Sequence, residues 1–121
     1  VEKIAKSTIE IMINEFGANP KMMIAGIGPS ISPAVYEVGL DVISLVKQAF
    51  GNENVLKYLP GSEKALFDLW QANKIVLTES GIPASNIEIA EMCTFSNPDL
   101  FYSARRDKPV TGRLATGIMM V

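Results

Sequence analysis

Apolar residues recur every three or four positions over the first sixteen residues of the chain. Polar and charged side chains fill the positions between them, which is the pattern of an amphipathic helix. Gly17 follows directly and suits the left-handed conformation that ends many helices. We therefore predict a helix over residues 1–16. Its pattern is in phase from the first residue, with no capping residue ahead of it, so we expect the chain to begin inside this element.

The rest of the chain alternates between strand-like and helix-like segments. A continuous apolar run over residues 21–27, bounded by Pro20 and Gly28, predicts a buried strand. Two prolines and a glycine then predict a loop over residues 28–33. Downstream, spacing and breaker residues predict, in chain order, a helix over 38–50, a turn over 51–54, a strand over 55–59, a helix that opens at 61–63 and continues to 77, a strand over 87–91, a short helical turn over 99–102 and a strand over 113–121.

This order of elements, without repeats or linkers, indicates one unit of mixed helix and strand, and 121 residues are enough for one domain. The net charge of −2 argues against a general binder of nucleic acid or of membrane surfaces. No apolar run reaches the roughly 18 residues of a membrane span. A single cysteine excludes an internal disulfide and suits a reducing compartment, so we expect a cytoplasmic protein.

The chain contains no histidine. This excludes Ser-His and Cys-His nucleophilic pairs, imidazole bases and His-ligated metal sites from these residues. With one cysteine, zinc sites built from thiolates are excluded as well. We therefore expect no metal to be bound by this chain alone, and any chemistry must use carboxylates, Lys, Arg, Tyr or backbone amides.

Positive charge is concentrated near the C-terminus. Residues 103–113 hold three arginines and a lysine against Asp107, a local charge of +3, so the rest of the chain sums to −5. Arginine forks bind phosphate or carboxylate through paired hydrogen bonds, so this loop suits an anion pocket in which Asp107 orients a guanidinium. Alternatively, these side chains are solvated charges that offset acidic residues elsewhere. The residues alone leave both interpretations open.

Two other segments invite a functional interpretation less strongly. Residues 26–30 follow a predicted strand, as phosphate loops do, but the spacing is not that of a dinucleotide-binding motif and Pro29 lacks an amide proton. A tight turn in which the backbone passes close to another segment is the better interpretation. Cys93 has no histidine partner and is interpreted as a buried hydrophobic residue rather than a nucleophile.

Three segments resemble one known family. They are IAGIGPSISPAVYEVG (24–39), LFDLWQANKIVLTESGI (66–82) and CTFSNPDLFYSARRDKPVTGR (93–113), and with their spacing they account for nearly all of the chain. Together they resemble the C-terminal half of the YfiH-type family, whose members are also labelled laccase-domain or multicopper polyphenol oxidase proteins. The last segment is the most specific, because it carries the family's Cys-Thr, Phe-x-Ser-x-Arg-Arg-Asp and Thr-Gly-Arg pattern.

The resemblance implies an α+β fold, with helices packed on layered mixed sheets, in which residues 1–121 form the C-terminal part of a single domain. It also implies phosphorolysis of purine nucleosides at a zinc site. Deamination of adenosine is attributed to the family too, and some members are linked to editing of peptidoglycan precursors. The family's zinc ligands, two histidines and a cysteine, lie in its N-terminal half. Zinc is therefore expected in the full-length parent, and this chain alone is expected to be metal-free and inactive. Cys93 matches the family's later Cys-Thr pair, not its metal ligand.

A phosphorolytic enzyme must hold phosphate against a sugar that gains positive charge, and arginines supply this positioning. On the strength of the resemblance, we expect catalytic roles for Arg106 first and then Arg105, with Asp107 aligning them. The expected substrate-binding residues are Arg113, Ser103, Tyr102, Gly28 and Pro29, the two last as parts of the wall of the site.

A non-catalytic module that binds anions on the same fold is the alternative from a different class. The expected partners are a purine nucleoside and phosphate, with no nucleic acid and no membrane. We also expect the chain to self-associate or to pair with the N-terminal half of its domain, because dividing a shared sheet exposes a strand edge.

Overall fold

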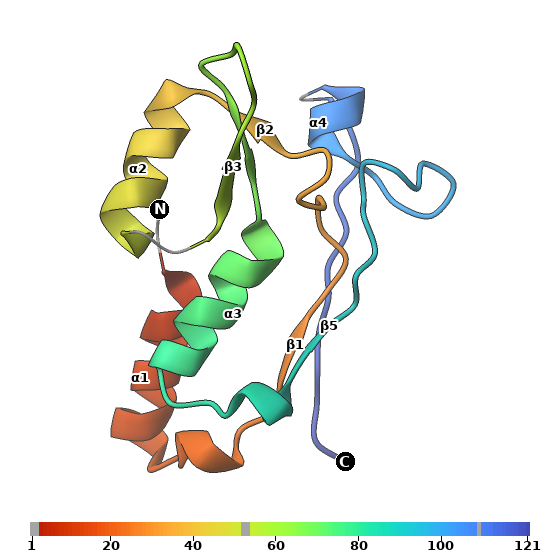
Figure 1. Ribbon diagram of the computed structural model, residues 1–121. Coiled ribbons are helices and arrows are strands. Elements are labelled where there is room, and N and C mark those ends of the chain that lie inside the picture. The colour runs from red at the N-terminus through yellow and green to blue at the C-terminus, as the bar shows by residue number, and fades with distance from the viewer. Residues whose placement is uncertain (1–2, 52–53, 109) are drawn as a thin grey trace.

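The computed structural model describes residues 3–51, 54–108 and 110–121 (Figure 1). Along the chain the elements are α1 (Ile4–Phe16), the 3₁₀ turn η1 (Pro20–Met22), β1 (Ala25–Ile27), β2 (Glu37–Val38), α2 (Leu40–Phe50), β3 (Leu56–Tyr58), β4 (Ala65–Phe67), α3 (Leu69–Glu79), the 3₁₀ turn η2 (Ala84–Asn86), β5 (Ile87–Ile89) and α4 (Ala104–Asp107). Helices combined with parallel and antiparallel strands confirm the predicted α+β class. None of the helices in these ranges is long and apolar enough to cross a membrane.

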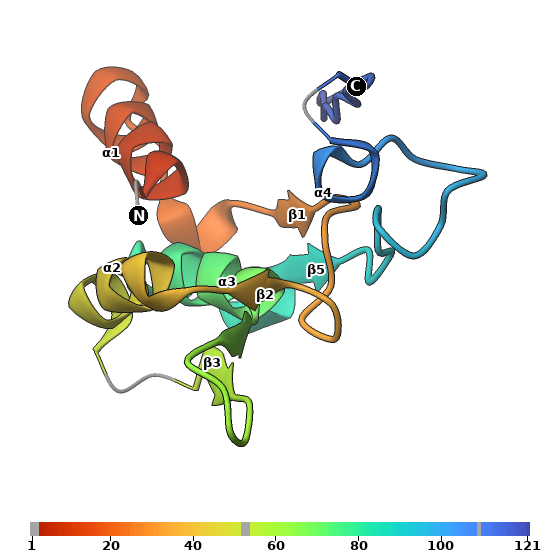
Figure 2. The same ribbon diagram turned by 90° about the horizontal axis from the view of Figure 1, so that it is seen from above.

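The strands form two separate sheets. β1 and β5 pair in parallel, with Ala25 opposite Ile87. β4 lies between β2 and β3 and is antiparallel to both. Figures 1 and 2 show α3 between α2 and the β1–β5 pair. Because β1 and β5 are parallel, the loops that follow their carboxyl ends start at the same edge of this sheet.

Helix α3 joins two hydrophobic clusters. Its residues Ala72 and Val76 pack with buried side chains of α2, β2 and β4. Its residue Leu77 packs with Ile9 of α1 and Ile87 of β5. Because α3 buries side chains in both clusters, it fixes the antiparallel sheet and the parallel pair relative to each other, and with them the loops that each sheet carries.

The first helix ends as the sequence predicts. Gly17 has a φ of 64°, and the N–H groups of Gly17 and Ala18 bond to the carbonyls of Ile13 and Met12. This arrangement satisfies two carbonyls at the end of the helix and needs the left-handed conformation that glycine adopts without strain. Residues 1–2 of the predicted helix and residues 52–53 of the predicted turn lie outside the described residues.

The prediction of a helix opening at residues 61–63 is wrong. Residues Ala65–Phe67 form β4, because this segment pairs with β2 on one side and β3 on the other and buries Ala65 and Phe67. The helix begins only at Leu69, where the Asp68 carboxylate accepts the N–H of Gln71 at 2.9 Å. Partners distant in sequence thus decided the conformation of a segment whose own spacing suited a helix.

The predicted strand over residues 113–121 does not form either. In the described residues 110–121 the chain has no regular secondary structure, and its apolar side chains stay exposed, Ile118 by 85% and Met120 by 96%. A strand requires a neighbour to accept and donate its backbone hydrogen bonds. The tail has the side chains of a strand, but within the described residues it has no such neighbour.

Two other boundaries differ from the prediction. The Asn19 side chain accepts the N–H of Lys21 at 3.1 Å and starts η1, so the strand predicted from residue 21 begins only at Ala25. Asn97 does open a turn, in which its carbonyl accepts the N–H of Phe101 at 3.0 Å. The helix predicted over residues 99–102 forms instead at Ala104–Asp107, where a better cap is present.

Candidate functional site

The short helix α4 is held by bonds between its two ends. The hydroxyl of Ser103 accepts the N–H of Arg106 at 3.3 Å, and the Ser103 carbonyl accepts the N–H of Asp107 at 2.8 Å. The Asp107 carboxylate in turn accepts the N–H of Ser103 at 3.3 Å. Ser103 is buried, and these bonds satisfy it there. The cap thus fixes the direction in which the neighbouring arginine side chains leave the helix.

Arg106 is bonded entirely within the protein. Its Nε and Nη2 donate to the two carboxylate oxygens of Asp107, both at 2.9 Å. Nη1 donates to the carbonyls of Thr94 and Phe95 at 2.8 and 3.0 Å, and Nη2 also donates to the carbonyl of Phe101 at 2.7 Å. A guanidinium has five N–H groups, so all its donors are engaged. The mutual hydrogen bonds raise the pKa of Arg106 and lower the pKa of Asp107.

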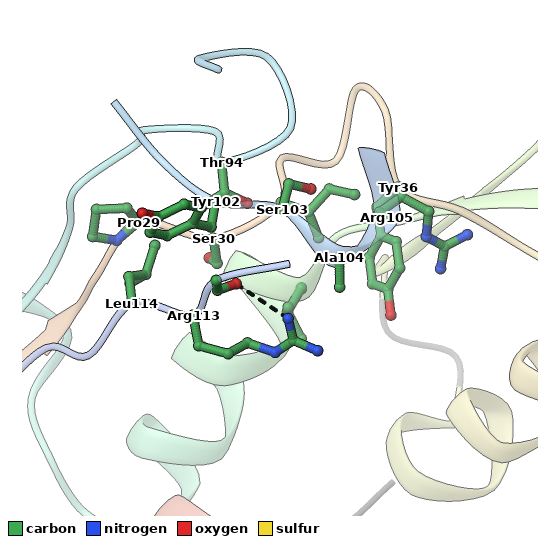
Figure 3. A pocket seen from close by; sticks show the side chains of 13 residues that line it. Pro29, Ser30, Tyr36, Thr94, Tyr102, Ser103, Ala104, Arg105, Arg113 and Leu114 are labelled. Atoms are coloured by element: carbon green, nitrogen blue, oxygen red, sulfur yellow. Dashed lines mark hydrogen bonds between the residues drawn. The ribbon is translucent and has the colours of Figure 1, made fainter. Parts of the chain in front are cut away.

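A pocket of about 350 Å³ lies beyond the carboxyl ends of β1 and β5 (Figure 3). Sites for ligands are common at this edge of parallel sheets. Five of the eight predicted site residues line the pocket, namely Pro29, Tyr102, Ser103, Arg105 and Arg113. Arg106 and Asp107 do not line it, and Gly28 lines a second hollow. The structure therefore brings most of the predicted residues together but separates the two neighbouring arginines.

Both Arg105, which belongs to α4, and Arg113, which follows α4 by six residues, line the pocket. Nη1 of Arg105 donates to the Glu37 carbonyl at 3.2 Å, and its guanidinium lies 5.2 Å from the centre of the Tyr36 ring. Nη1 of Arg113 donates to the carbonyls of Thr111 and Gly112. Neither arginine forms an ion pair within the described residues. Two uncompensated guanidiniums at one pocket favour an anionic ligand.

The pocket also has an apolar wall. Tyr102 is 60% exposed, and its ring packs on the backbone of Gly112. Pro29 and Leu114 contribute further apolar surface to the lining. Aromatic and aliphatic surface of this kind suits the flat face of a ring.

Sequence reasoning missed several residues of the pocket. They are Ser30, Ile31, Tyr36, Leu69, Thr94, Ala104, Gly112 and Leu114. Most of them lie in loops whose meeting depends on the parallel pairing of β1 with β5. This pairing continues past the strands as a bridge between Ser30 and Cys93. A sequence signal existed only in that all of these residues except Leu114 fall within the segments that resemble the family.

The second hollow, of about 490 Å³, lies between β1 and the C-terminal tail. Gly28 packs here so closely that a Cβ on residue 28 would lie 2.8 Å from Cγ2 of Thr116. The close approach of backbone to another segment, expected at this glycine, is therefore an approach to the tail. Gly28 positions the tail, which also carries Arg113 and Leu114, rather than lining the pocket itself.

Cys93 lies behind the pocket and is 7% exposed. Its sulfur accepts the backbone N–H of Ser32 at 3.3 Å. Burial raises the pKa of this thiol, but hydrogen bonds from Ser32 and Ser96 outweigh burial and lower the pKa to about 6. Its burial agrees with the interpretation of Cys93 as a buried hydrophobic residue, and its bond to Ser32 also connects two loops.

The acidic residues and the cysteine do not assemble a metal site. Within residues 3–51, 54–108 and 110–121, no three side chains of His, Cys, Asp or Glu converge on a point where they could hold an ion. Zinc requires three or four such ligands. The described residues therefore do not fit a zinc site.

The family model for the multi-copper polyphenol oxidoreductase laccase matches residues 1–121. The chain belongs to this family. Blue and multinuclear copper sites depend on histidine ligands, and this chain has none, so the copper chemistry in the family's name has no support among these residues.

Several relatives cover almost the whole chain, among them the following two. The purine nucleoside phosphorylase of Bacteroides thetaiotaomicron is 36% identical over 121 residues, which are 99% of this chain and 45% of the relative. Adenosine deaminase RL5, from an unknown prokaryotic organism, is 39% identical over 119 residues, which are 98% of this chain and 45% of the relative.

A solved structure shares the fold. The crystal structure of the hypothetical protein YfiH of Bacillus licheniformis superimposes with a TM-score of 0.81 at 30% identity, covering 88% of this chain and 40% of that protein. The chain thus spans somewhat less than half the length of the proteins it matches.

Proposed function

We propose that the complete protein carrying this chain catalyses the phosphorolysis of purine nucleosides, and that this chain supplies the pocket for phosphate. One observation carries the proposal: Arg105 and Arg113 both line a pocket whose wall includes the exposed ring of Tyr102. The name of the relative from Bacteroides thetaiotaomicron, which is similar over 99% of the chain, supports the same reaction class.

In this reaction an oxygen of phosphate attacks C1′ of the nucleoside. The bond between C1′ and the base breaks, and its electron pair leaves with the base, which takes up a proton. The products are the free base and ribose 1-phosphate. Arg105 and Arg113 would hold the phosphate through charge-assisted bonds while the sugar gains positive charge, and Tyr102 and Pro29 would face the base.

Deamination of adenosine is a second candidate, because the relative named adenosine deaminase RL5 is 39% identical to this chain. This reaction replaces the amino group of adenosine by an oxygen from water and releases ammonia. It needs no phosphate, so the two arginines would then act only on the substrate. The two candidates are therefore separated by their dependence on phosphate.

Zinc, in this proposal, is bound by the complete protein through residues outside this chain, where it would polarise or activate water or phosphate. The ligands are placed outside this chain because its described residues do not fit a zinc site. What these residues themselves do is bind and orient the anion and cover the base. By itself the 121-residue chain should bind phosphate weakly and turn over no nucleoside. We place the reaction in the cytoplasm, in keeping with the single cysteine.

The test uses the complete protein, purified from its native cells and identified by intact mass and metal content. Adenosine and inosine are incubated with it, with and without phosphate, and the products are separated by chromatography. Phosphorolysis predicts free base and ribose 1-phosphate only when phosphate is present. Conversion of adenosine to inosine without phosphate would favour deamination, and the absence of both reactions would overturn the proposal.

The role of the pocket is tested by removing one charge at a time. Arg105→Gln and Arg113→Gln should each raise the KM for phosphate about tenfold or more, since each removes a charge-assisted contact. Lys108→Gln is the matched control, because Lys108 belongs to the same exposed loop but does not line the pocket. Equal effects of all three substitutions would mean that the loop acts only through its overall charge.

A further inference from the structure

The two adjacent arginines have opposite surroundings, although the sequence places them side by side. All five donors of Arg106 are bonded to the protein, and two of these bonds go to a carboxylate. Arg105 uses one nitrogen for a single backbone carbonyl and lines the pocket. A phosphate that bound Arg106 would have to displace Asp107 or leave partly buried carbonyls without a donor.

The Arg106–Asp107 pair ties together the segments that surround the pocket. Arg106 bonds to the carbonyls of residues 94, 95 and 101. Besides Arg106, Asp107 accepts the N–H of Ser103 at 3.3 Å and the hydroxyl of Thr111 at 3.5 Å. The pair therefore lies next to both arginines whose side chains line the pocket. Arg105 directly precedes Arg106, and Arg113 follows Thr111 by two residues.

We infer that Arg106 and Asp107 are positioning residues, which fix Arg105 and Arg113 at the anion pocket, and that Arg106 does not itself bind the anion. This inference rests on the proposed function in that the anion is taken to be phosphate. It reverses the order expected from the sequence, in which Arg106 was the first candidate for contact with substrate. Asp107 neutralises Arg106, whereas the pocket arginines keep their charge for the ligand.

Asp107→Asn separates the two roles by the sign of its effect. If Arg106 bound phosphate, removing the competing carboxylate would free its guanidinium and lower the KM for phosphate. If the pair positions the pocket arginines, the substitution weakens four bonds and raises this KM, we expect by about tenfold. A fall in KM would overturn the inference.

Double variants provide a readout that a general loss of stability would not move. With the pair intact, Arg105→Gln should raise the KM for phosphate about tenfold. In an Asp107→Asn background, Arg105 is no longer held at the pocket, so the same substitution should change KM less than threefold. Effects that multiply independently would contradict a positioning role, even if Asp107→Asn lowers the melting temperature.

Chemical labelling tests the inference without any turnover, so its failure is distinguishable from failure of the proposed reaction. Phenylglyoxal modifies accessible guanidiniums, and peptide mass spectrometry of the complete protein locates the modified residues. We expect modification at Arg105 and Arg113, protection of both by inorganic phosphate, and no modification at Arg106. In Asp107→Asn, Arg106 should become reactive. Modification of Arg106 in the unsubstituted protein, with protection by phosphate, would overturn the inference.

Discussion

The ring of Tyr102 packs directly on the backbone of Gly112, where a Cβ would come within 2.7 Å of the ring carbons. Tyr102 precedes α4 and Gly112 follows it, so this contact closes the segment that carries Arg105. The ring is 60% exposed and lines the pocket. The absence of a side chain at Gly112 therefore determines the position of this ring in the pocket wall.

Gly112→Ala should displace the Tyr102 ring. Because the ring is largely exposed and turns away readily, we expect the free energy of unfolding to fall by less than about 1 kcal/mol. The KM for nucleoside, however, should rise several-fold, as measured by steady-state kinetics. Gly117→Ala is the matched control, since a Cβ there meets no atom within 4 Å. An unchanged KM for nucleoside in Gly112→Ala would exclude Tyr102 from the base subsite.

The ring of Tyr36 supports Arg105 through a cation–π contact at 5.2 Å. Exposed contacts of this kind contribute about 0.5–1 kcal/mol, so Tyr36→Leu should weaken phosphate binding about two- to fivefold. The loss of the ring pair with Phe67, whose centroid lies 5.7 Å away, should also lower stability by about 1 kcal/mol. Tyr36→Phe keeps both contacts and should match the unsubstituted protein in phosphate titrations followed by calorimetry. A weakened Tyr36→Phe would point to the hydroxyl instead.

The Cys93 thiol should make stability depend on pH. Hydrogen bonds lower its pKa in the fold to about 6, against an ordinary value of 9.0, so the folded state releases this proton earlier than the unfolded state. The free energy of unfolding should therefore rise between about pH 6 and pH 9, with a slope of at most about 1.4 kcal/mol per pH unit. The stabilisation that the thiol contributes at pH 9 should be lost as the pH falls towards 6. Urea titrations of the protein and of Cys93→Ala, at half-unit steps of pH, measure this. The same slope in both would refute the lowered pKa.

Several large apolar side chains are strongly exposed. In α1, η1 and the tail, Phe16, Met22, Met119 and Met120 are each about 80% exposed or more. Since the relatives are about twice the length of this chain, we predict that the rest of the polypeptide covers this surface in the complete protein. Peroxide should then oxidise Met119 and Met120 slowly in the complete protein and rapidly in the 121-residue chain, as peptide mass spectrometry would show.

The same side chains should make the 121-residue chain self-associate when it is expressed alone, because exposed large apolar side chains favour association. Light scattering measures the mass in solution. A monodisperse monomer whose methionines oxidise as slowly as those of the complete protein would contradict the prediction. A dimer in the complete protein with the same protected methionines would assign the surface to a second copy.

The sequence predicted those helices whose apolar spacing and terminal residues are visible within the segment itself. The apolar period up to Phe16 and the glycine after it predicted the end of α1, and helical spacing predicted α2. The concentration of arginines directed attention to a loop of which Arg105 and Arg113 line a pocket. In each case neighbouring residues contain the information, since helix periodicity and caps act within a few residues.

The sequence could not predict features that depend on distant partners. Residues 65–67 suited a helix until β2 and β3 provided a ladder on both sides. The tail suited a strand, but it pairs with none of the strands among the described residues. The pocket depends on the parallel pairing of β1 with β5, which brings two loops more than 60 residues apart to one edge.

By itself the sequence determined the α+β class and the family, and it predicted an arginine-rich site for an anion, because these follow from residue types and local spacing. Only the tertiary structure decided which arginine faces the pocket. Arg105 and Arg106 are equivalent in charge and adjacent in sequence, but successive side chains of a helix point about 100° apart. One guanidinium is therefore bonded to loop carbonyls and Asp107, and the other makes a single bond to a carbonyl in a residue that lines the pocket.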